Sequence, residues 1–538
     1  MKKVLTILTA FCIAALLFAG CNDEFDSLVD ANADRHPIPD TEIEAASGDA
    51  DFSNYVAIGN SLTAGYMDGA LYDNGQRFSV AAILAAQLEA AGGATTFVQP
   101  DINSENGFNT LANSGGSNVL GRFKLDTSIP GPSPTVNGDE ISVYDGPVSE
   151  LNNFGVPGIK VGQLLTADTG VSGTDSFNPF YERFASSPGS STVLEDVISA
   201  DPTFFTLWIG NNDVLGFAAS GGTNADELTT QEEFTQQFSE IVTELLDETS
   251  ARGVVANIPP ILALPLFQAV PYNAIELDAA TAATLNENFA SFNAVLDGIA
   301  ESPLVAFDEE DADQRRVTYQ EGNNPILIID EDLQDLGPTF DLLVQFGQIT
   351  EEQRAALEPY RQARQMTVDN NTGRELVLFS AASILGTPAE PGNPNTPIGV
   401  AIPLGAEYVL TAQNIVEVET ARATFNAIIE NSVSAGGPRL ALFDTNDPSG
   451  PLFDIFGLDN SEPGITVDGV DLEPDFSPNG VFSTDGVHPN ARGNALLVNE
   501  MIDIIEAEFD AVLPRADVLS YPTVTLCGGD CVSQQGGS

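Results

Sequence analysis

The residue types that support nucleophilic catalysis are scarce in this chain of 538 residues. It has two histidines, and His36 lies in an acidic segment near the start. His488 is therefore the one histidine that the folded body can use as a general base. Ser61 follows a short apolar run, Tyr55–Gly59. A serine hydroxyl is a weak nucleophile by itself and needs such a base.

An acid that could orient this base is close at hand. Asp485 stands three residues before His488, in the sequence Asp-Gly-Val-His. A turn there brings the carboxylate to the imidazole Nδ1, which fixes the tautomer and stabilises the imidazolium. Taken singly, an Asp-x-x-His pair is most often without function, and Gly-Asn-Ser is most often a turn. Together they favour Ser61 as nucleophile, His488 as base and Asp485 as its partner.

Acyl transfer also needs hydrogen-bond donors aimed at the developing alkoxide. Two segments suit this role. Trp208–Asp213 places amide side chains after an apolar run, and Asn153–Gly158 places glycine N–H groups in a tight turn. By itself, Asn-Asn-Asp is more often the start of a helix.

In this order, the segments resemble the sequence blocks of the SGNH (GDSL-type) hydrolases, which are esterases and lipases. The matching blocks are Gly59–Leu62, the turn ending at Gly158, Gly210–Asp213 and Asp485–His488, and Val254–Pro260 resembles a further, less specific block. The resemblance covers about 52–265 and 400–512. It implies a serine mechanism with an oxyanion hole made by the Ser61 N–H, the Gly158 N–H and the Asn212 side chain.

One residue departs from the family pattern. The family usually has Asp where this chain has Asn60. We expect activity to survive, because Asn keeps much of the hydrogen bonding and this residue is not the partner of the nucleophile.

The candidate catalytic residues must be positioned by strands and helices, which the sequence indicates as apolar runs alternating with helical patterns. Strands are expected near 55–59, 204–209, 253–258 and 440–443, and helices near 80–91, 233–249 and 491–509. This alternation predicts an α/β fold with a parallel sheet covered on both faces. The family resemblance makes it a flavodoxin-like, three-layer α/β/α domain. Ligands of such open sheets bind outside the carboxyl ends of the strands.

The segment between about 265 and 400 interrupts the alternation. Its own helices are expected near 279–300 and 350–364, and a proline-rich stretch covers 387–397. We interpret it as an insertion that, together with the loops of 92–150, shapes or covers the substrate cleft. The predicted organisation is a signal peptide at 1–20, an acidic tether at 21–50, a hydrolase core at 51–265 and 401–515, the insertion at 266–400, and a tail at 516–538.

The charge balance limits the classes of molecule that the protein can bind. The chain has 78 acidic and 19 basic residues and a formal net charge of −59. This excess excludes nucleic acid, which needs a Lys/Arg surface, and disfavours adsorption to anionic lipid. Two histidines cannot form a His-Glu-x-x-His zinc site, and no EF-hand pattern is present. We expect no metal and no cofactor.

The start of the chain indicates export. Lys2 and Lys3 precede an apolar run that is too short to span a bilayer and that ends at Ala19-Gly20-Cys21. This resembles a bacterial lipobox, in which Cys21 becomes the lipidated N-terminus; the alternative is an ordinary signal peptide. The acidic residues just after it resemble the surface-export signals of Bacteroidetes lipoproteins. We therefore expect a lipid anchor in the bacterial outer membrane.

Two cysteines remain near the other end, in Cys527-Gly-Gly-Asp-Cys531. In an oxidising compartment we expect them to form a disulfide. The alternative is a metal or redox pair.

These observations predict an ester hydrolase of the carboxylesterase or lipase type. Its substrate would be a small-molecule, lipid or glycan ester, and the lipid anchor would be its only link to the membrane. Two alternatives stay open: a carbohydrate O-acetylesterase, and a non-catalytic surface binding lipoprotein on the same scaffold.

Overall fold

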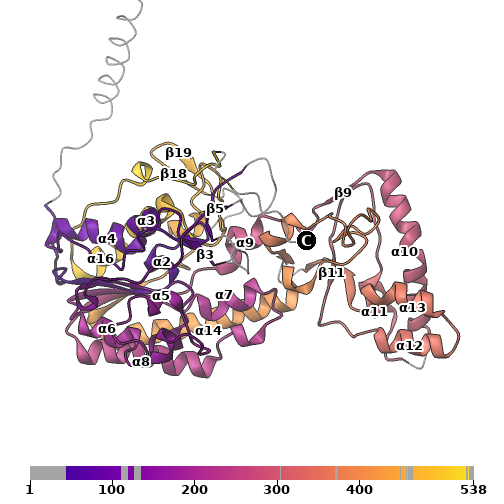
Figure 1. Ribbon diagram of the computed structural model, residues 1–538, viewed down its shortest axis with the longest axis horizontal. Coiled ribbons are helices and arrows are strands. Elements are labelled where there is room, and N and C mark those ends of the chain that lie inside the picture. The colour runs from indigo at the N-terminus through magenta and orange to yellow at the C-terminus, as the bar shows by residue number, and fades with distance from the viewer. Residues whose placement is uncertain are drawn as a thin grey trace, which may run out of the picture. The chain divides into compact units, whose positions relative to one another are not determined.

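Five parallel strands form the central sheet in the computed structural model of the chain (Figure 1). The structure describes residues 44–110, 119–126, 135–302, 305–369, 373–448, 450–455, 457, 464–528 and 531. In chain order the strands of this sheet are β1 (Tyr55–Gly59), β6 (Asn153–Gly155), β7 (Phe204–Trp208), β8 (Arg252–Ala256) and β17 (Leu440–Phe443).

The strand order of this sheet is β6-β1-β7-β8-β17, with every pair parallel. Numbered along the chain, this is the order 2-1-3-4-5 of flavodoxin-like folds. The predicted α/β, flavodoxin-like fold is therefore confirmed. The order reverses between β1 and β7, and this switch point is where such sheets bind their ligands.

The register brings the carboxyl ends of the strands together. Gly59 of β1 pairs with Gly155 of β6 and with Trp208 of β7, which in turn pairs with Ala256 of β8. The residues that follow these strands therefore begin at one edge of the sheet.

Helices cover both faces of the sheet. Figure 1 shows α4 (Val80–Leu88) and α16 (Ala491–Phe509) on one side and α8 (Gln231–Glu248) and α14 (Ala412–Gly436) on the other. The α8 helix begins with a capping box in which Thr230 and Glu233 bond each other's main-chain N–H groups. Its Phe234 stacks on Phe425 of α14 with ring centroids 4.0 Å apart.

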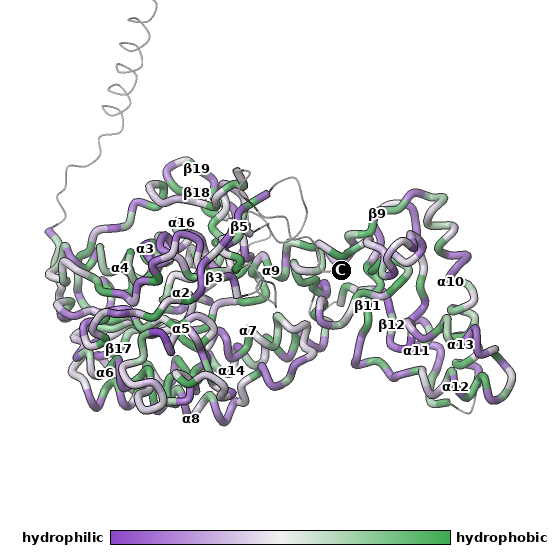
Figure 2. The backbone as a smooth tube through the Cα atoms, viewed as in Figure 1, coloured by the Kyte–Doolittle hydropathy of each residue, from purple (hydrophilic) through white to green (hydrophobic). Residues whose placement is uncertain are grey.

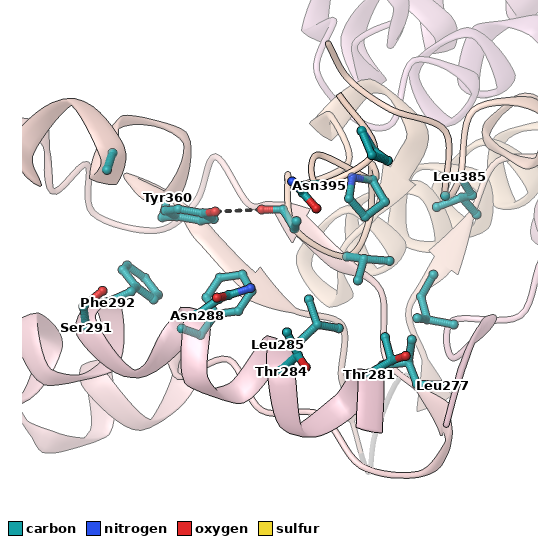
Figure 3. Close-up of a pocket in the computed structure, with 18 of the residues that line it drawn as sticks. Leu277, Thr281, Thr284, Leu285, Asn288, Ser291, Phe292, Tyr360, Leu385 and Asn395 are labelled. Atoms are coloured by element: carbon teal, nitrogen blue, oxygen red, sulfur yellow. Dashed lines mark hydrogen bonds between the residues drawn. The ribbon is translucent and has the colours of Figure 1, made fainter. Parts of the chain in front are cut away.

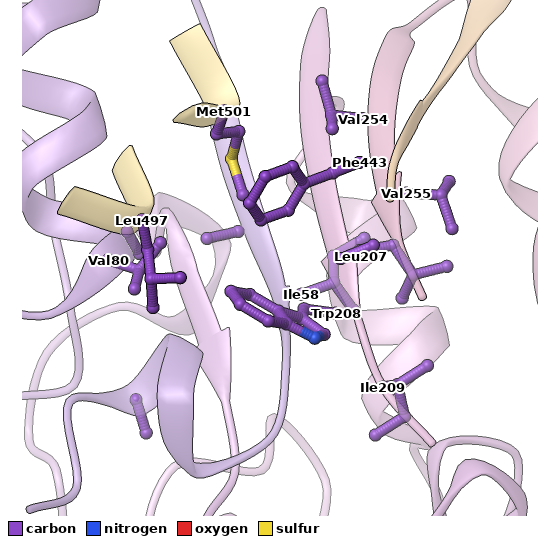
Figure 4. Packing of buried hydrophobic residues seen from close by; sticks show 14 of the residues in the cluster. Ile58, Val80, Leu207, Trp208, Ile209, Val254, Val255, Phe443, Leu497 and Met501 are labelled. Atoms are coloured by element: carbon purple, nitrogen blue, oxygen red, sulfur yellow. The ribbon is translucent and has the colours of Figure 1, made fainter. Parts of the chain in front are cut away.

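The core on the α16 side is built on a few large side chains (Figure 4). Trp208 and Phe443 meet edge to face with centroids 5.6 Å apart, and Leu497 and Met501 of α16 lie beside them. All four are nearly inaccessible to solvent. This packing fixes the position of α16 over the sheet, and with it the residues that immediately precede the helix.

A second hydrophobic core is formed by residues between Val270 and Val409. Its helices are α10 (Ala279–Ala300), α11 (Glu309–Arg315), α12 (Gly337–Gln345) and α13 (Glu351–Leu357), and its strands pair in twos. Figure 2 shows hydrophobic segments recurring in this region as well as in the main sheet. The insertion expected at 266–400 covers most of this range.

That region also contains a buried ion network. Arg364 lies between Asp330 and Glu375, with its Nε 2.6 Å from Asp330 Oδ2 and its Nη1 2.8 Å from Glu375 Oε2. All three side chains are almost fully buried. Glu375 also accepts the N–H of Ala412 (3.2 Å), the first residue of α14.

Two sequence-based predictions of local structure are wrong. The helix expected at 350–364 ends at Leu357, because Pro359 follows and a short 3₁₀ turn leads into β12 (Ala363–Gln365). The tether was expected to reach residue 50, but Ala46 pairs with Val512 and Ala50 is buried. The strand expected at 204–209 and the helix expected at 279–300 are confirmed as β7 and α10.

The predictions for the two ends of the chain are covered only in part. The signal peptide, Cys21 and residues 22–43 lie outside the described residues. Cys527 and Cys531 are joined by a disulfide. No helix of the described part of the chain is both long and apolar enough to cross a membrane.

Candidate active site

Ser61 begins a one-turn helix, α2 (Ser61–Ala64), directly after β1. Asn60 caps this helix, because its Oδ1 accepts the Leu62 N–H at 3.0 Å. Gly59 is needed just before it: a Cβ there would lie 2.3 Å from the Trp208 carbonyl oxygen and 2.4 Å from Thr63 Oγ1. The strand therefore passes its neighbours closely and then turns sharply, which places the Ser61 hydroxyl beyond the edge of the sheet.

His488 joins the other two predicted catalytic residues. Its Nε2 lies 2.8 Å from Ser61 Oγ, and its Nδ1 lies 2.9 Å from Asp485 Oδ2. The hydroxyl and the carboxylate thus approach opposite nitrogens of one imidazole ring. This is the geometry in which a base can take the serine proton while the acid holds the ring.

The Asp485 carboxylate is buried and fully hydrogen-bonded. Its Oδ1 accepts the N–H groups of Val487 and His488, both at 2.9 Å, and its Oδ2 also accepts the Gly69 N–H at 3.0 Å. Burial raises the pKa of Asp485, but the charge and the hydrogen bonds of His488 outweigh burial and lower the pKa to about 2. Asp485 is therefore ionised across the whole neutral range.

Asp68, in the loop that follows α2, ties this loop to the segment that contains Asp485 and His488. Its carboxylate accepts the N–H and the hydroxyl of Thr484 and the hydroxyl of Tyr72, and its own N–H donates to Ser483 Oγ at 3.0 Å. Sequence reasoning missed Asp68. The one signal was the Asp-Gly pair Asp68-Gly69, which marks a turn, and Asp68 has the positive φ of such a turn (55°).

Gly158 and Asn212 lie where the strands β6 and β7 end. Gly158 has a φ of +77°, and a Cβ there would meet no atom within 4 Å. Asn212 begins α7 (Asn212–Ala219), and its Nδ2 donates to the Ile159 carbonyl at 2.8 Å. That bond ties the side chain of one predicted donor to the turn of the other. Among the described residues, no acceptor receives the N–H of Ser61 or of Gly158.

Asp213 also joins the two segments that follow β6 and β7. It is fully buried, and it accepts the Val161 N–H at 3.1 Å and the Thr229 hydroxyl at 2.7 Å. Burial raises the pKa of Asp213 to about 6, although these hydrogen bonds and Lys160 lower it.

A cavity of about 40 Å³ opens beside Ser61 and His488. Its walls are mostly apolar and include Leu62, Leu215 and Phe482. Trp208 and Asn211 are among the polar residues that line it, and no described residue bonds the Trp208 Nε1 or the Asn211 Oδ1. In Figure 4 the Trp208 nitrogen points toward the carboxyl end of β7. Sequence reasoning could not foresee these two unpaired atoms.

No group of three or more His, Cys, Asp or Glu side chains within the described ranges is arranged to hold a metal ion.

A comparison with known families gives one match. A model of the GDSL-like lipase/acylhydrolase family matches residues 55–331. No curated protein and no solved structure matches the chain. The family match spans more than half of the chain and contains Ser61, Gly158 and Asn212, and it ends before Asp485 and His488. The protein belongs to the GDSL-like lipase/acylhydrolase family and is a hydrolase that acts on ester bonds.

Proposed function

We propose that the protein hydrolyses carboxylic esters through an acyl-enzyme on Ser61. The observation that supports this most directly is the position of His488, within 2.9 Å of both Ser61 Oγ and Asp485 Oδ2. Ser61 Oγ attacks the ester carbonyl carbon while His488 Nε2 takes the hydroxyl proton. Asp485 stabilises the imidazolium that results.

The negative charge then develops on the former carbonyl oxygen. We propose that the N–H groups of Ser61 and Gly158 and the Nδ2 of Asn212 receive it, since preorganised donors stabilise such an oxyanion. When the C–O bond to the alcohol breaks, His488 gives its proton to the leaving oxygen. Water next attacks the acyl carbon, His488 takes a proton from it, and the acid leaves as Ser61 regains its hydroxyl.

The size and lining of the cavity favour short acyl groups. A volume of about 40 Å³ holds about three groups the size of a water molecule. A long alkyl chain would also leave Trp208 Nε1 and Asn211 Oδ1 unpaired, which costs about 1–3 kcal/mol for each group. A short acyl group leaves space for water to bond both. Among the candidate activities, an esterase for short acyl groups, such as an O-acetylesterase, is therefore favoured over a lipase.

The test is labelling with a fluorophosphonate probe together with hydrolysis of p-nitrophenyl acetate and octanoate. We expect labelling and turnover in the native protein, neither in Ser61→Ala nor in His488→Ala, and faster turnover of acetate. Ser239→Ala, on the exposed face of α8, is the matched control and should behave as the native protein. A folded native protein without labelling or turnover would instead support a binding protein on a hydrolase scaffold.

We also propose that the protein is exported and anchored in the outer membrane through Cys21. The support is the sequence alone: Lys2 and Lys3, the short apolar run, and the cysteine that ends it. Metabolic labelling with a palmitate analogue tests this. The label should be absent from Cys21→Ser, and a native protein that takes up no label would refute the anchor.

A further inference from the structure

A groove of about 770 Å³ lies within the region of the second core (Figure 3). It runs between α10 on one side and α13 and the segment 394–401 on the other. None of the residues that line it lines the cavity at Ser61, so the two are separate sites. Its volume is that of a typical small-molecule site, about 300–1,000 Å³.

The floor of the groove is apolar. Leu285, Phe289 and Phe292 of α10 and the ring of Tyr360 form it. The Tyr360 hydroxyl donates to the Ala401 carbonyl at 2.7 Å, as the dashed line in Figure 3 shows. That bond satisfies the one polar atom of the ring and holds the ring against the groove. The surface below a ligand is therefore hydrocarbon.

One edge of the groove is polar but uncharged. Thr281, Thr284, Asn288 and Ser291 follow one another at intervals of three or four residues, and thus lie along one face of α10. All four are exposed. Asn395 faces them from the other side in Figure 3. Hydroxyl and amide groups therefore run the length of a hydrocarbon floor.

The groove has few charged residues for a chain that is so strongly acidic. Among the described residues that line it, Glu276 is the one that is charged. Residues 266–400 contain 22 acidic residues, six arginines and no lysine. Each of the six guanidinium groups already has a partner in the protein: Arg315, Arg316, Arg354, Arg361, Arg364 and Arg374. None of the six lines the groove, so among its described lining residues no cation is present to bind the carboxylate or phosphate of a ligand.

We infer that this groove binds an uncharged, chain-like amphiphile. Its apolar chain lies on the floor of Leu285, Phe289 and Phe292, and its hydroxyl or ether oxygens meet the polar edge of α10. A fatty acid of the same length is rejected, because its carboxylate would enter an acidic region without a counter-ion. A sugar without the chain is rejected as well, because it would leave the hydrocarbon floor exposed.

Calorimetric titration with three probes tests this inference. The probes are n-dodecyl β-maltoside below its critical micelle concentration, dodecanoate, and maltose. The alkyl maltoside should bind at least about tenfold more tightly, about 1.4 kcal/mol, than either of the others. None of the probes is an ester. Binding therefore does not depend on Ser61, and a failure of the proposed hydrolysis would not affect the result.

Variants of Asn288 locate the site. Asn288→Trp fills the groove and should abolish binding of the alkyl maltoside. Asn288→Lys adds the missing cation and should strengthen binding of dodecanoate by about tenfold or more. Ala290→Lys, exposed on α10 but outside the groove, is the matched control and should leave dodecanoate binding unchanged. These positions are on the surface, so thermal unfolding should show native-like stability.

Several results would overturn the inference. Equal affinity of the native protein for dodecanoate would refute the charge argument, and equal affinity for maltose would indicate a sugar site. Binding of the alkyl maltoside that persists in Asn288→Trp would place the ligand elsewhere. Sedimentation that shows a dimer which Asn288→Trp dissociates would show that a second copy of the chain occupies the groove.

Discussion

Thr484 donates both its main-chain N–H and its hydroxyl to one carboxylate oxygen of Asp68, at 3.0 and 2.7 Å. The residues that follow these two are joined as well: the Gly69 N–H donates to Asp485 Oδ2 at 3.0 Å. Two loops that are 416 residues apart in sequence are thus fastened together beside the imidazole. The orientation of Asp485 therefore depends on the loop that follows α2.

Replacing Asp68 should therefore impair catalysis without removing any group that touches the substrate. We predict that Asp68→Ala lowers kcat by about 10- to 100-fold, since small displacements of catalytic groups have effects of this size, and leaves KM nearly unchanged. Asp68→Asn keeps an acceptor for Thr484 and should recover most of the loss. Asp51→Ala, an exposed aspartate, is the control. Steady-state kinetics decide, and equal kcat in the native protein and Asp68→Ala would refute the positioning role.

Asn60 occupies the position where the family usually has aspartate, and its side chain makes a capping hydrogen bond. Its Oδ1 accepts the Leu62 N–H and caps the helix that presents Ser61. An aspartate supplies the same acceptor, so Asn60→Asp should keep kcat/KM within about threefold of the native value. Asn60→Ala removes the cap, which costs about 1 kcal/mol, and should lower kcat/KM further than Asn60→Asp. A large loss in Asn60→Asp, with Asn60→Ala unaffected, would contradict the capping role.

Asp213 should make the folded protein less stable as pH rises, the opposite of most acidic residues. Burial raises its pKa in the folded protein to about 6 from 3.8, so the folded state holds the proton more tightly than the unfolded state. Its contribution is favourable below about pH 3.8 and is lost as pH rises through about 6, by on the order of 3 kcal/mol. Asp213→Asn removes this dependence.

The measurement is the free energy of unfolding in urea, for the native protein and Asp213→Asn, between pH 4 and pH 8. The difference between the two should change in favour of the variant as pH rises. Because the other acidic residues are common to both proteins, their titration cancels in this difference. A difference that stays constant with pH would show that the Asp213 carboxyl titrates near its ordinary pKa.

The buried Arg364 is predicted to matter more for stability than any exposed arginine of the same region. Arg364→Met leaves Asp330 and Glu375 buried without a counter-charge, which costs about 3–5 kcal/mol. Arg354→Met is the matched control: Arg354 bonds Asp341 at 2.7 Å, but that carboxylate is 68% exposed, and exposed pairs contribute about 0–1 kcal/mol. Urea unfolding distinguishes the two. Equal losses would indicate that burial does not decide the contribution of these pairs.

The sheet and the meeting of Ser61, Asp485 and His488 were predictable for definite reasons. The strand before Ser61 is a continuous apolar run that ends at a glycine, as expected of a strand buried on both faces. His488 could be identified because the chain has only one other histidine. The contact of Asp68 with Thr484 could not be foreseen, because it joins segments 416 residues apart through a turn with positive φ. The end of the helix at Leu357 was missed because its pattern continues past Pro359.

The cavity beside Ser61 yields a prediction about chain length. Leu215 lines it and is only half-buried, so Leu215→Ala should lengthen the cavity with little loss of stability. A longer acyl chain would then find hydrocarbon-lined space, and each added methylene contributes about 0.8 kcal/mol when it is buried. We expect the ratio of kcat/KM for p-nitrophenyl octanoate to that for acetate to rise by about tenfold. Leu343→Ala, which changes a partly buried leucine outside the cavity, should leave the ratio unchanged. An unchanged ratio in Leu215→Ala would mean that the acyl chain does not enter this cavity and that the preference for short acyl groups has another origin.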